Sequence, residues 1–168
     1  VAMSVFGKDE VAMRKYASSM PLPEFSDTPF NKTKPIDQCK VAIVTTAALH
    51  RMGTPGFEIG DSDFHYETLP KDARDLMLGH YSVNFDRGGF AAYINVVYPI
   101  DRLEEMAAGG VIGDVADYHY AFAGNQSTTV SEIRLDSGPH CAKQMLAEEV
   151  DIVVISGTCP LCTRTVCT

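Results

Sequence analysis

The sequence lacks an excess of basic residues. Its 168 residues include 14 Lys and Arg against 22 Asp and Glu, which gives a formal net charge of −8 at pH 7. Proteins that bind nucleic acid need clustered Lys and Arg to neutralise phosphates. We therefore expect no nucleic-acid partner.

Long apolar runs are also lacking. The apolar runs, such as residues 41–44 and 152–155, have the length of a strand. They fall far short of the 18 or more residues that a membrane-spanning helix needs. The first ten residues include Lys8, Asp9 and Glu10 and do not resemble a secretory signal peptide. We expect no membrane span and a cytoplasmic protein.

The cysteine pattern does not suggest a disulfide framework. Five cysteines are an odd number, and three of them (Cys159, Cys162 and Cys167) crowd the last ten residues. This pattern is more typical of a reduced compartment with a reactive or metal-binding cluster. We interpret Cys39 and Cys141 as buried small residues.

The chain divides into an arm and one domain. Residues 1–38 contain four prolines, with a short helix predicted from Asp9 as N-cap through Tyr16. Residues 39–168 form the predicted α/β domain, one unit by its length. Because the sequence stops where a new helix should begin, we expect this domain to be truncated at its C-terminus.

Apolar strands alternate with capped helices along the domain. Strands are predicted at residues 41–46, 64–69, 94–98, 115–122 and 151–155. One helix begins with Asp101 as N-cap and Glu104 at N3 and stops at Gly109, and another runs from Pro139 to Glu149. This alternation predicts an α/β fold with a doubly wound, mostly parallel, Rossmann-like sheet and an extended N-terminal arm.

A Cys-x-x-Cys pair follows the last predicted strand. In open α/β sheets ligands bind beyond the carboxyl ends of the strands. Unpaired N–H groups of a following helix and the nearby Arg164 would lower the pKa of Cys159, and Cys162 could attack a bond formed there. The arrangement favours two-electron thiol chemistry. The alternatives are inert packing or half a zinc site, completed by Cys167 and a distant His or Cys39.

Three histidines could reach the same edge. His50 follows the first core strand, His80 lies in a predicted loop, and His119 lies within a predicted strand. Each could donate a proton to a leaving amine, and each could equally be a structural histidine. His65 and His140 are predicted at the surface.

Several segments resemble one enzyme family in order along the chain. They are residues 41–50, 67–70, 79–81, 94–103, 110–112, 119–124 and 150–151, followed by the cysteine motif. They are similar to the selenoprotein B family of glycine/sarcosine/betaine reductase and D-proline reductase, most of all to its D-proline branch. In that family the first position of the motif is selenocysteine, where this sequence has Cys159. Thr163 and the intervening Pro160 and Leu161 also depart from the D-proline pattern.

The resemblance implies a mechanism and partners. A pyruvoyl group on a partner subunit would activate the substrate amine, the Cys159 thiolate would break the C–N bond, and Cys162 would release the product as a disulfide forms. This chain would bind no cofactor itself and would belong to a hetero-oligomer that receives electrons from a dithiol or electron carrier. Arg164, His50, His80 and His119 complete the candidate site. The alternatives are a general dithiol/disulfide oxidoreductase and a non-catalytic zinc-binding or scaffolding subunit.

Overall fold

A computed structural model describes residues 9–19, 31–58, 63–80, 87–124, 126, 131–158, 162, 165 and 166. Seven strands lie in this part of the chain: β1 (Lys40–Thr45), β2 (Leu49–Arg51), β3 (Tyr66–Pro70), β4 (Leu76–Leu78), β5 (Asp114–Val115), β6 (Tyr118–Phe122) and β7 (Ile152–Ser156). The helices are α1 (Glu10–Ser19), α2 (Gly88–Ala92), α3 (Ile100–Ala108) and α4 (Gly138–Ala147), with 3-10 turns η1 (Ile36–Gln38) and η2 (Ile94–Val96) and a π-helix η3 (Ile133–Ser137).

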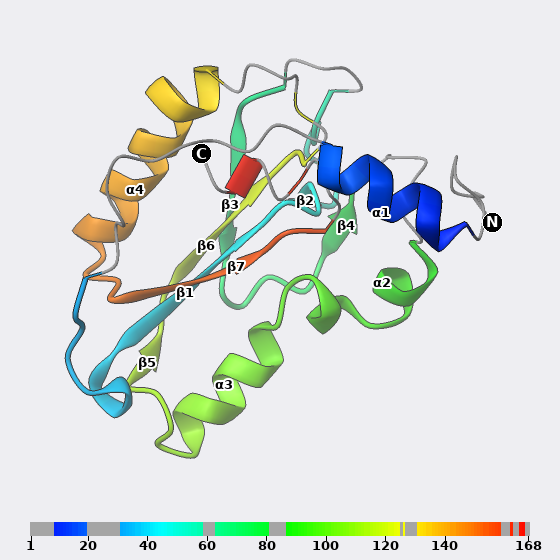
Figure 1. The fold of residues 1–168 in the computed structure, drawn as a ribbon. Helices are drawn as coiled ribbons and strands as arrows, with labels where there is room; N and C mark the ends of the chain where they lie inside the picture. The colour runs from blue at the N-terminus through cyan, green and yellow to red at the C-terminus, as the bar shows by residue number, and fades with distance from the viewer. Residues whose placement is uncertain are drawn as a thin grey trace.

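Strand β1 is the centre of the main sheet (Figure 1). It pairs in parallel with β7 from Val41 to Thr45, and in parallel with β5 and β6 along its other edge. Strand β3 pairs with β6 in the antiparallel sense, and β2 and β4 form a separate antiparallel pair. The α/β class is confirmed. The predicted doubly wound, mostly parallel, Rossmann-like arrangement is not confirmed: the sheet is mixed, because β3 enters as an antiparallel edge strand beside β6.

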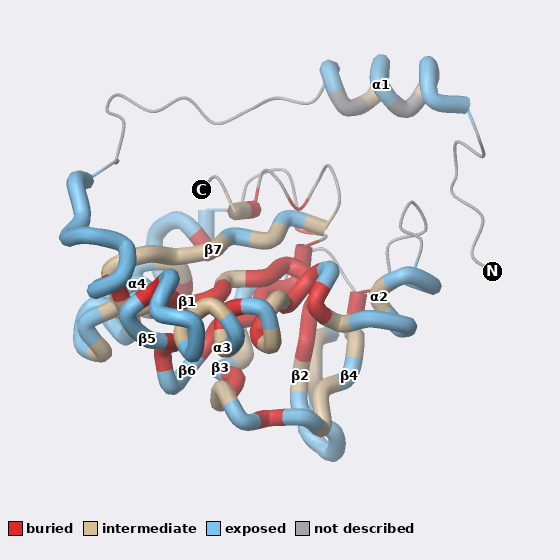
Figure 2. Tube along the Cα trace, turned by 90° about the horizontal axis from the view of Figure 1, so that it is seen from below, coloured by how far each residue is buried: buried red, intermediate tan, exposed pale blue. Residues whose placement is uncertain are grey.

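The main helices cover opposite faces of this sheet. On one face, Ile100 and Leu103 of α3 pack with Ile43 of β1 in the larger core cluster. On the other face, Cys141 of α4 packs with Phe122 of β6 in a second cluster. Figure 2 shows that burial concentrates in the strands between these layers. The β-branched run in β1 is buried because both of its faces are covered.

Strand β7 borders the sheet. Among the described strands only β1 pairs with it. Ile152, Val153 and Val154 are half-buried, and Ile155 is 51% exposed. The strand predicted at residues 151–155 therefore lies at an edge of the sheet in the described part of the chain.

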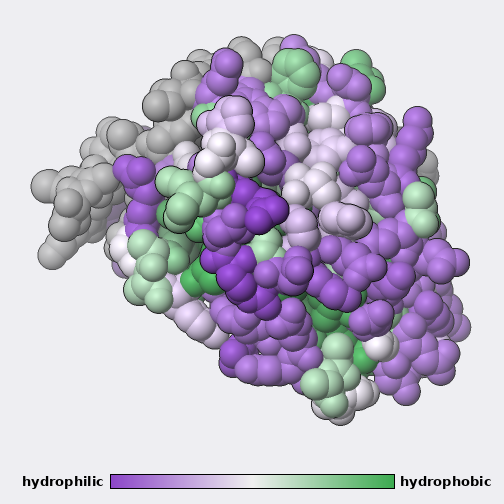
Figure 3. Space-filling model, turned by 180° about the vertical axis from the view of Figure 1, so that it is seen from behind, coloured by the Kyte–Doolittle hydropathy of each residue, from purple (hydrophilic) through white to green (hydrophobic). Residues whose placement is uncertain are grey.

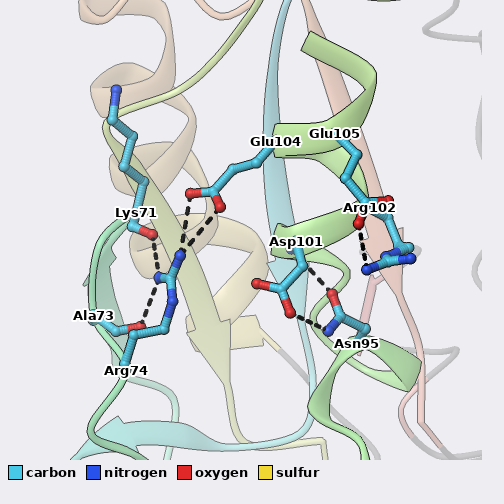
Figure 4. A network of polar contacts seen from close by, with 8 residues as sticks. All are labelled: Lys71, Ala73, Arg74, Asn95, Asp101, Arg102, Glu104 and Glu105. Atoms are coloured by element: carbon cyan, nitrogen blue, oxygen red, sulfur yellow. Dashed lines mark hydrogen bonds and ion pairs between the residues drawn. The ribbon is translucent and has the colours of Figure 1, made fainter. Parts of the chain in front are cut away.

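The prediction of a strand at residues 94–98 is wrong. Residues 94–96 form η2, and Pro99, which lacks an N–H group and restricts the residue before it, follows at the start of α3. The predicted capping by Asp101 is also wrong: Oδ1 of Asn95 accepts a hydrogen bond from the Asp101 N–H (3.0 Å), and its Nδ2 donates to Asp101 Oδ2 (2.7 Å) (Figure 4). Glu104, the expected partner of that cap, binds Arg74 instead.

Other predicted elements are confirmed within one or two residues. Asp9 caps α1 by accepting a hydrogen bond from the N–H of Ala12 (3.0 Å). The predicted helices at 101–109 and 139–149 correspond to α3 and α4, and Cys39 and Cys141 are buried. The predicted strand at 115–122 is divided into β5 and β6 by a break at residues 116–117. The boundary of the arm at residue 38 stays a prediction.

The face of the molecule seen from behind is largely polar. Hydrophilic side chains cover most of this face, and apolar groups form smaller patches between them (Figure 3). His65 and His140 are exposed, as predicted. None of the helices in the described ranges is long and apolar enough to cross a bilayer.

Candidate functional site

The carboxyl ends of three parallel strands converge on a cluster of threonine hydroxyls. Directly after β1, the Thr46 N–H donates to the carbonyl of Ser156 at the end of β7 (3.1 Å). The Thr158 N–H donates to Thr46 Oγ1 (3.1 Å), and the Thr158 hydroxyl lies 3.3 Å from both the hydroxyl and the carbonyl oxygen of Thr46. These bonds fix the chain at the point where it leaves β7 for the cysteine motif.

Cys162 lies directly over this cluster. Its side chain is fully buried, and its Sγ is 3.2 Å from Thr158 Oγ1. Gly124, just beyond β6, leaves the room for it: a Cβ on Gly124 would overlap Cys162 Sγ and would lie 2.8 Å from the carbonyl oxygen of Thr46. The Thr165 hydroxyl donates to the carbonyl of Gly124 (3.3 Å). The sulfur is therefore held from β1, β6 and β7 together.

His80 reaches the same sulfur from a distant part of the chain. It follows β4, and its Nε2 is 3.3 Å from Cys162 Sγ although 82 residues separate the two. The side chain is 2% exposed. Burial, with a smaller contribution from the positive charge of Arg87, lowers the pKa of His80 to about 4. The imidazole is neutral at pH 7 and can offer the sulfur an N–H group.

His50 lies near His80 without contacting the sulfur in any described interaction. Its Nδ1 donates to the carbonyl of Ala48 (3.2 Å), and its ring packs against Gly56 and Gly79, where an added Cβ would lie 2.9 and 3.3 Å from ring atoms. Gly79 directly precedes His80 and also donates its N–H to Ala48 O (3.0 Å). Ala48 has a φ of 51°, which is unusual for a residue with a side chain. The turn after β1 is thus shaped to bring β2 and β4, and with them both histidines, beside the sheet edge.

His119 occupies a different place. It is fully buried in β6 on the face covered by α3, where its ring meets Tyr98 edge-on at 5.5 Å. Its Nδ1 accepts a hydrogen bond from the N–H of Ile43 (3.1 Å), beside the break between β5 and β6. Burial lowers the pKa of His119 to about 4. In the structure this histidine completes the hydrogen bonding of β1 in mid-sheet and is not brought to Cys162.

Two of the predicted site residues, Cys159 and Arg164, lie outside the described residues, as does Cys167. Cys39, considered above as a zinc ligand, lies at the amino end of β1, whereas Cys162 lies beyond its carboxyl end. Six strand residues separate the two ends by about 20 Å. Cys39 and Cys162 therefore cannot share one metal ion. No group of three or more potential ligands stands ready for a metal within the described ranges.

Sequence reasoning missed four contributors: Thr46, Gly124, Ala48 and Thr158. Thr46 directly follows β1 and Thr158 lies two residues beyond β7, and polar residues just after apolar strands are a recognisable signal for a sheet-edge site. Gly124 and Ala48 carry no such signal, because their role depends on a close approach and a backbone angle that only the folded chain reveals.

The family described as Glycine/sarcosine/betaine reductase selenoprotein B matches residues 8–158. The chain belongs to this family. The match ends one residue before Cys159, so that it includes the strand ends and His80 but not the cysteine motif.

Curated relatives of this family member are reductase subunits. The D-proline reductase subunit gamma of Acetoanaerobium sticklandii is 31% identical over 132 residues, which are 76% of this chain and 53% of that protein. The glycine reductase complex component B subunit gamma of Symbiobacterium thermophilum is 30% identical over 156 residues, 89% of this chain and 35% of that protein. The sarcosine reductase complex component B subunit beta of Peptoclostridium acidaminophilum is 26% identical over 155 residues, with the same two shares.

The chain thus spans between a third and about half of the length of these relatives. No solved structure is significantly similar to it.

Proposed function

We propose that this chain is the thiol-bearing part of a cytoplasmic, multi-subunit reductase that cleaves a C–N bond of an amino acid or amine. Cys159 is the nucleophile and Cys162 the resolving residue. The observation that carries the proposal is the buried Cys162 sulfur at the carboxyl ends of three parallel strands, in contact with His80 and Thr158. The family and the names of its relatives support a reductase subunit.

The reaction proceeds through two displacements. The Cys159 thiolate attacks the carbon that bears the amine, so that a C–S bond forms and the C–N bond breaks, its electron pair leaving with nitrogen. The Cys162 thiolate then attacks the Cys159 sulfur; the C–S bond breaks, and the carbon takes its electron pair and a proton. The carbon is reduced by two electrons and the two thiols are oxidised to a disulfide. An external dithiol or electron carrier reduces that disulfide and resets the site.

The amine must be activated before a thiolate can displace it. A pyruvoyl group on a partner subunit would supply the carbonyl for this purpose, and its nitrogen-bound product would be released there by water. Within this sequence no pyridoxal-lysine context and no Gly-x-Gly-x-x-Gly motif offers a substitute. The proposal therefore places the carbonyl on another subunit of a hetero-oligomer.

His80 acts on Cys162 by donating a hydrogen bond. Because burial holds its pKa near 4, the imidazole is a poor acceptor of the thiol proton. Cys162 is disulfide-bonded in the structure; once it is reduced, a neutral Nε2–H at this separation of 3.3 Å can stabilise negative charge on the sulfur. Hydrogen bonds to charged groups contribute about 1.5–3 kcal/mol, so the loss of this bond should make the Cys162 thiolate harder to form.

Mass spectrometry of the oxidised chain tests the cysteine pair. Mild oxidation should link Cys159 to Cys162, and dithiothreitol should reverse the link, while Cys39 and Cys141 stay reduced. Cys141→Ser serves as the control, because it removes a cysteine on the α4 side without touching the pair. Stoichiometric zinc with both thiols reduced would contradict the proposal.

Titration of Cys162 tests the role of His80. In a Cys159→Ala/Cys167→Ala background, the rate at which iodoacetamide alkylates Cys162, followed by mass spectrometry against pH, gives the pKa of that thiol. His80→Leu should raise that pKa, because the thiolate loses a hydrogen-bond donor, and His80→Gln, which keeps an N–H donor, should restore part of the difference. Equal values in all three proteins would refute the hydrogen-bond role.

Purification with untagged partners tests the reductase itself. A heteromeric complex should turn over an amine substrate and lose that activity with borohydride or hydroxylamine, which consume a pyruvoyl carbonyl. If the chain alone reduces disulfides and no amine is cleaved by the complex, it is a general dithiol oxidoreductase.

A further inference from the structure

An apolar cavity of about 130 Å³ lies between α4 and the carboxyl ends of β1 and β6. Val44 and Phe122 form its floor on the sheet, and Ile133, Cys141 and Met145 form its walls. Burial raises the pKa of the Cys141 thiol to about 12, so this side chain is a neutral apolar group at physiological pH. None of the described residues that line the cavity is charged.

The π-helix η3 shapes this cavity. Its residues Ile133–Ser137 run directly into α4, and π-helical turns are wider than α-helical ones and frequent at functional sites. Gly138 also lines the cavity, and a Cβ there would lie 2.6 Å from the carbonyl oxygen of Ile133. In addition, the Ser137 hydroxyl is buried without a hydrogen-bond partner in the described part of the chain. A wide turn and an unsatisfied buried hydroxyl both lower stability, and a role in ligand binding would explain why the chain keeps them.

Two threonines join the cavity to the candidate site. Thr46 lines the cavity and is within 3.3 Å of the Thr158 hydroxyl, which contacts Cys162 Sγ. Thr165 also lines the cavity and binds the carbonyl of Gly124, the residue packed against the same sulfur. A molecule whose apolar body fills the cavity therefore has its polar end beside these threonines and next to the sulfur.

We infer that this cavity binds the aliphatic ring or branched alkyl body of the substrate, and so selects amines of about four to six carbons against glycine. The inference rests on the proposed function for the identity of the occupant. The size of the occupant follows from the cavity volume and does not depend on the proposed function, since apolar cavities of about 150 Å³ accept molecules as large as benzene. Each buried methylene strengthens binding about fourfold, whereas glycine has only one to offer.

Neutral alcohols test the cavity without any cysteine chemistry. With ¹³C-methyl-labelled methionine, cyclopentanol should shift the Met145 methyl resonance at saturation and leave Met106, on the α3 face, and the exposed Met52 unchanged. Methanol should bind more than about 50-fold more weakly, because it buries several fewer methylenes. No shift of Met145, or equal shifts at all three methionines, would overturn the inference.

Matched variants on α4 assign the shift to the cavity. Cys141→Leu fills the space and should abolish the Met145 response to cyclopentanol, and the smaller Cys141→Val should weaken it. Lys143→Leu places the same new side chain on the exposed side of the helix and should leave the response intact. The Met106 resonance reports whether each variant is folded. Identical responses in Cys141→Leu and Lys143→Leu would also overturn the inference.

The failure of this inference can be told apart from failure of the proposed function. If the cysteines form no reversible disulfide but Met145 responds to cyclopentanol, the cavity is a binding site and the reductase proposal is wrong. If the disulfide forms and Met145 does not respond, only the cavity inference fails. In an active complex, Cys141→Leu should raise KM for a cyclic amine more than tenfold and leave KM for glycine unchanged.

Discussion

Gly124→Ala is the sharpest test of how the Cys162 sulfur is held. The new Cβ would lie 2.8 Å from the carbonyl oxygen of Thr46 and 3.1 Å from Cys162 Cβ, and it would overlap Cys162 Sγ. Carbon and oxygen atoms approach to about 3.3 Å at closest, so the Thr46 backbone must retreat by about 0.5 Å. Thr46 is bonded to β7 and to Thr158, and the displacement therefore reaches the whole sheet edge.

The expected cost follows from that overlap. Overpacking a close-packed site costs about 1–3 kcal/mol, and the entropy that alanine removes from the unfolded chain offsets about 0.4–1 kcal/mol of it. A net loss of about 1–2 kcal/mol in the free energy of unfolding lowers Tm by about 3–6 °C in a chain of this size. Because the sulfur must leave its contact with His80, the rate at which iodoacetamide labels reduced Cys162 should also change.

Gly89→Ala is the matched control. Nothing lies within 4 Å of its ideal Cβ, and the residue is in helix α2, where alanine is favoured over glycine by about 0.5–1 kcal/mol. Urea denaturation and the labelling rate should show a neutral or stabilised protein with an unchanged Cys162. If Gly124→Ala were as stable as Gly89→Ala and Cys162 reacted at the wild-type rate, the described packing around the sulfur would be wrong.

Two further predictions concern stability. His80 and His119 each have a folded-state pKa of about 4, below the unfolded value of 6.5. The unfolded chain therefore binds more protons, and the free energy of unfolding should fall as the pH drops from 6.5 towards 4. His80→Gln should make this fall less steep in chemical denaturation at a series of pH values, and an unchanged slope would contradict the prediction. Asn95→Ala removes both side-chain hydrogen bonds to Asp101 at the start of α3 and should lower the free energy of unfolding by about 1 kcal/mol in urea denaturation. Glu104→Gln breaks only an exposed ion pair and should lower it by at most about 0.5 kcal/mol. Equal losses would show that Asn95 does not hold the helix end.

The elements that the sequence predicts well are those with strong local signals. Strand β1 has a run of β-branched residues, α3 stops at a glycine pair, and α4 begins with a proline in its first turn. Strands β2 and β4 have three residues each, too few to show an alternating pattern. The mostly apolar segment at residues 94–98 was misleading because apolar 3-10 turns and short strands look alike in sequence.

The candidate site is predictable only in part for the same reason. The sequence alone predicts that the cysteine motif lies at the end of the last strand, because the two segments are adjacent in the chain. Which histidine meets Cys162 does not, because His80 arrives from the end of β4, a strand with no sequence signal, and its contact spans 82 residues. His119 looks equally suitable in sequence, but alternation along β6 turns it toward α3 and Ile43. Choosing between the two requires the register of β6 against β1 and β3.

The border strand β7 has a consequence for handling the isolated chain. Its sequence has no charge and no proline, and the edge that does not face β1 has no described partner strand. Natural sheets protect such borders with lysine, proline or a bulge, since an unprotected row of N–H and C=O groups recruits further strands. Concentrated solutions of this chain should therefore self-associate through β7. A lysine in place of Ile155, which is already half in solvent, is the substitution that should keep the chain monomeric without disturbing the buried side of the strand.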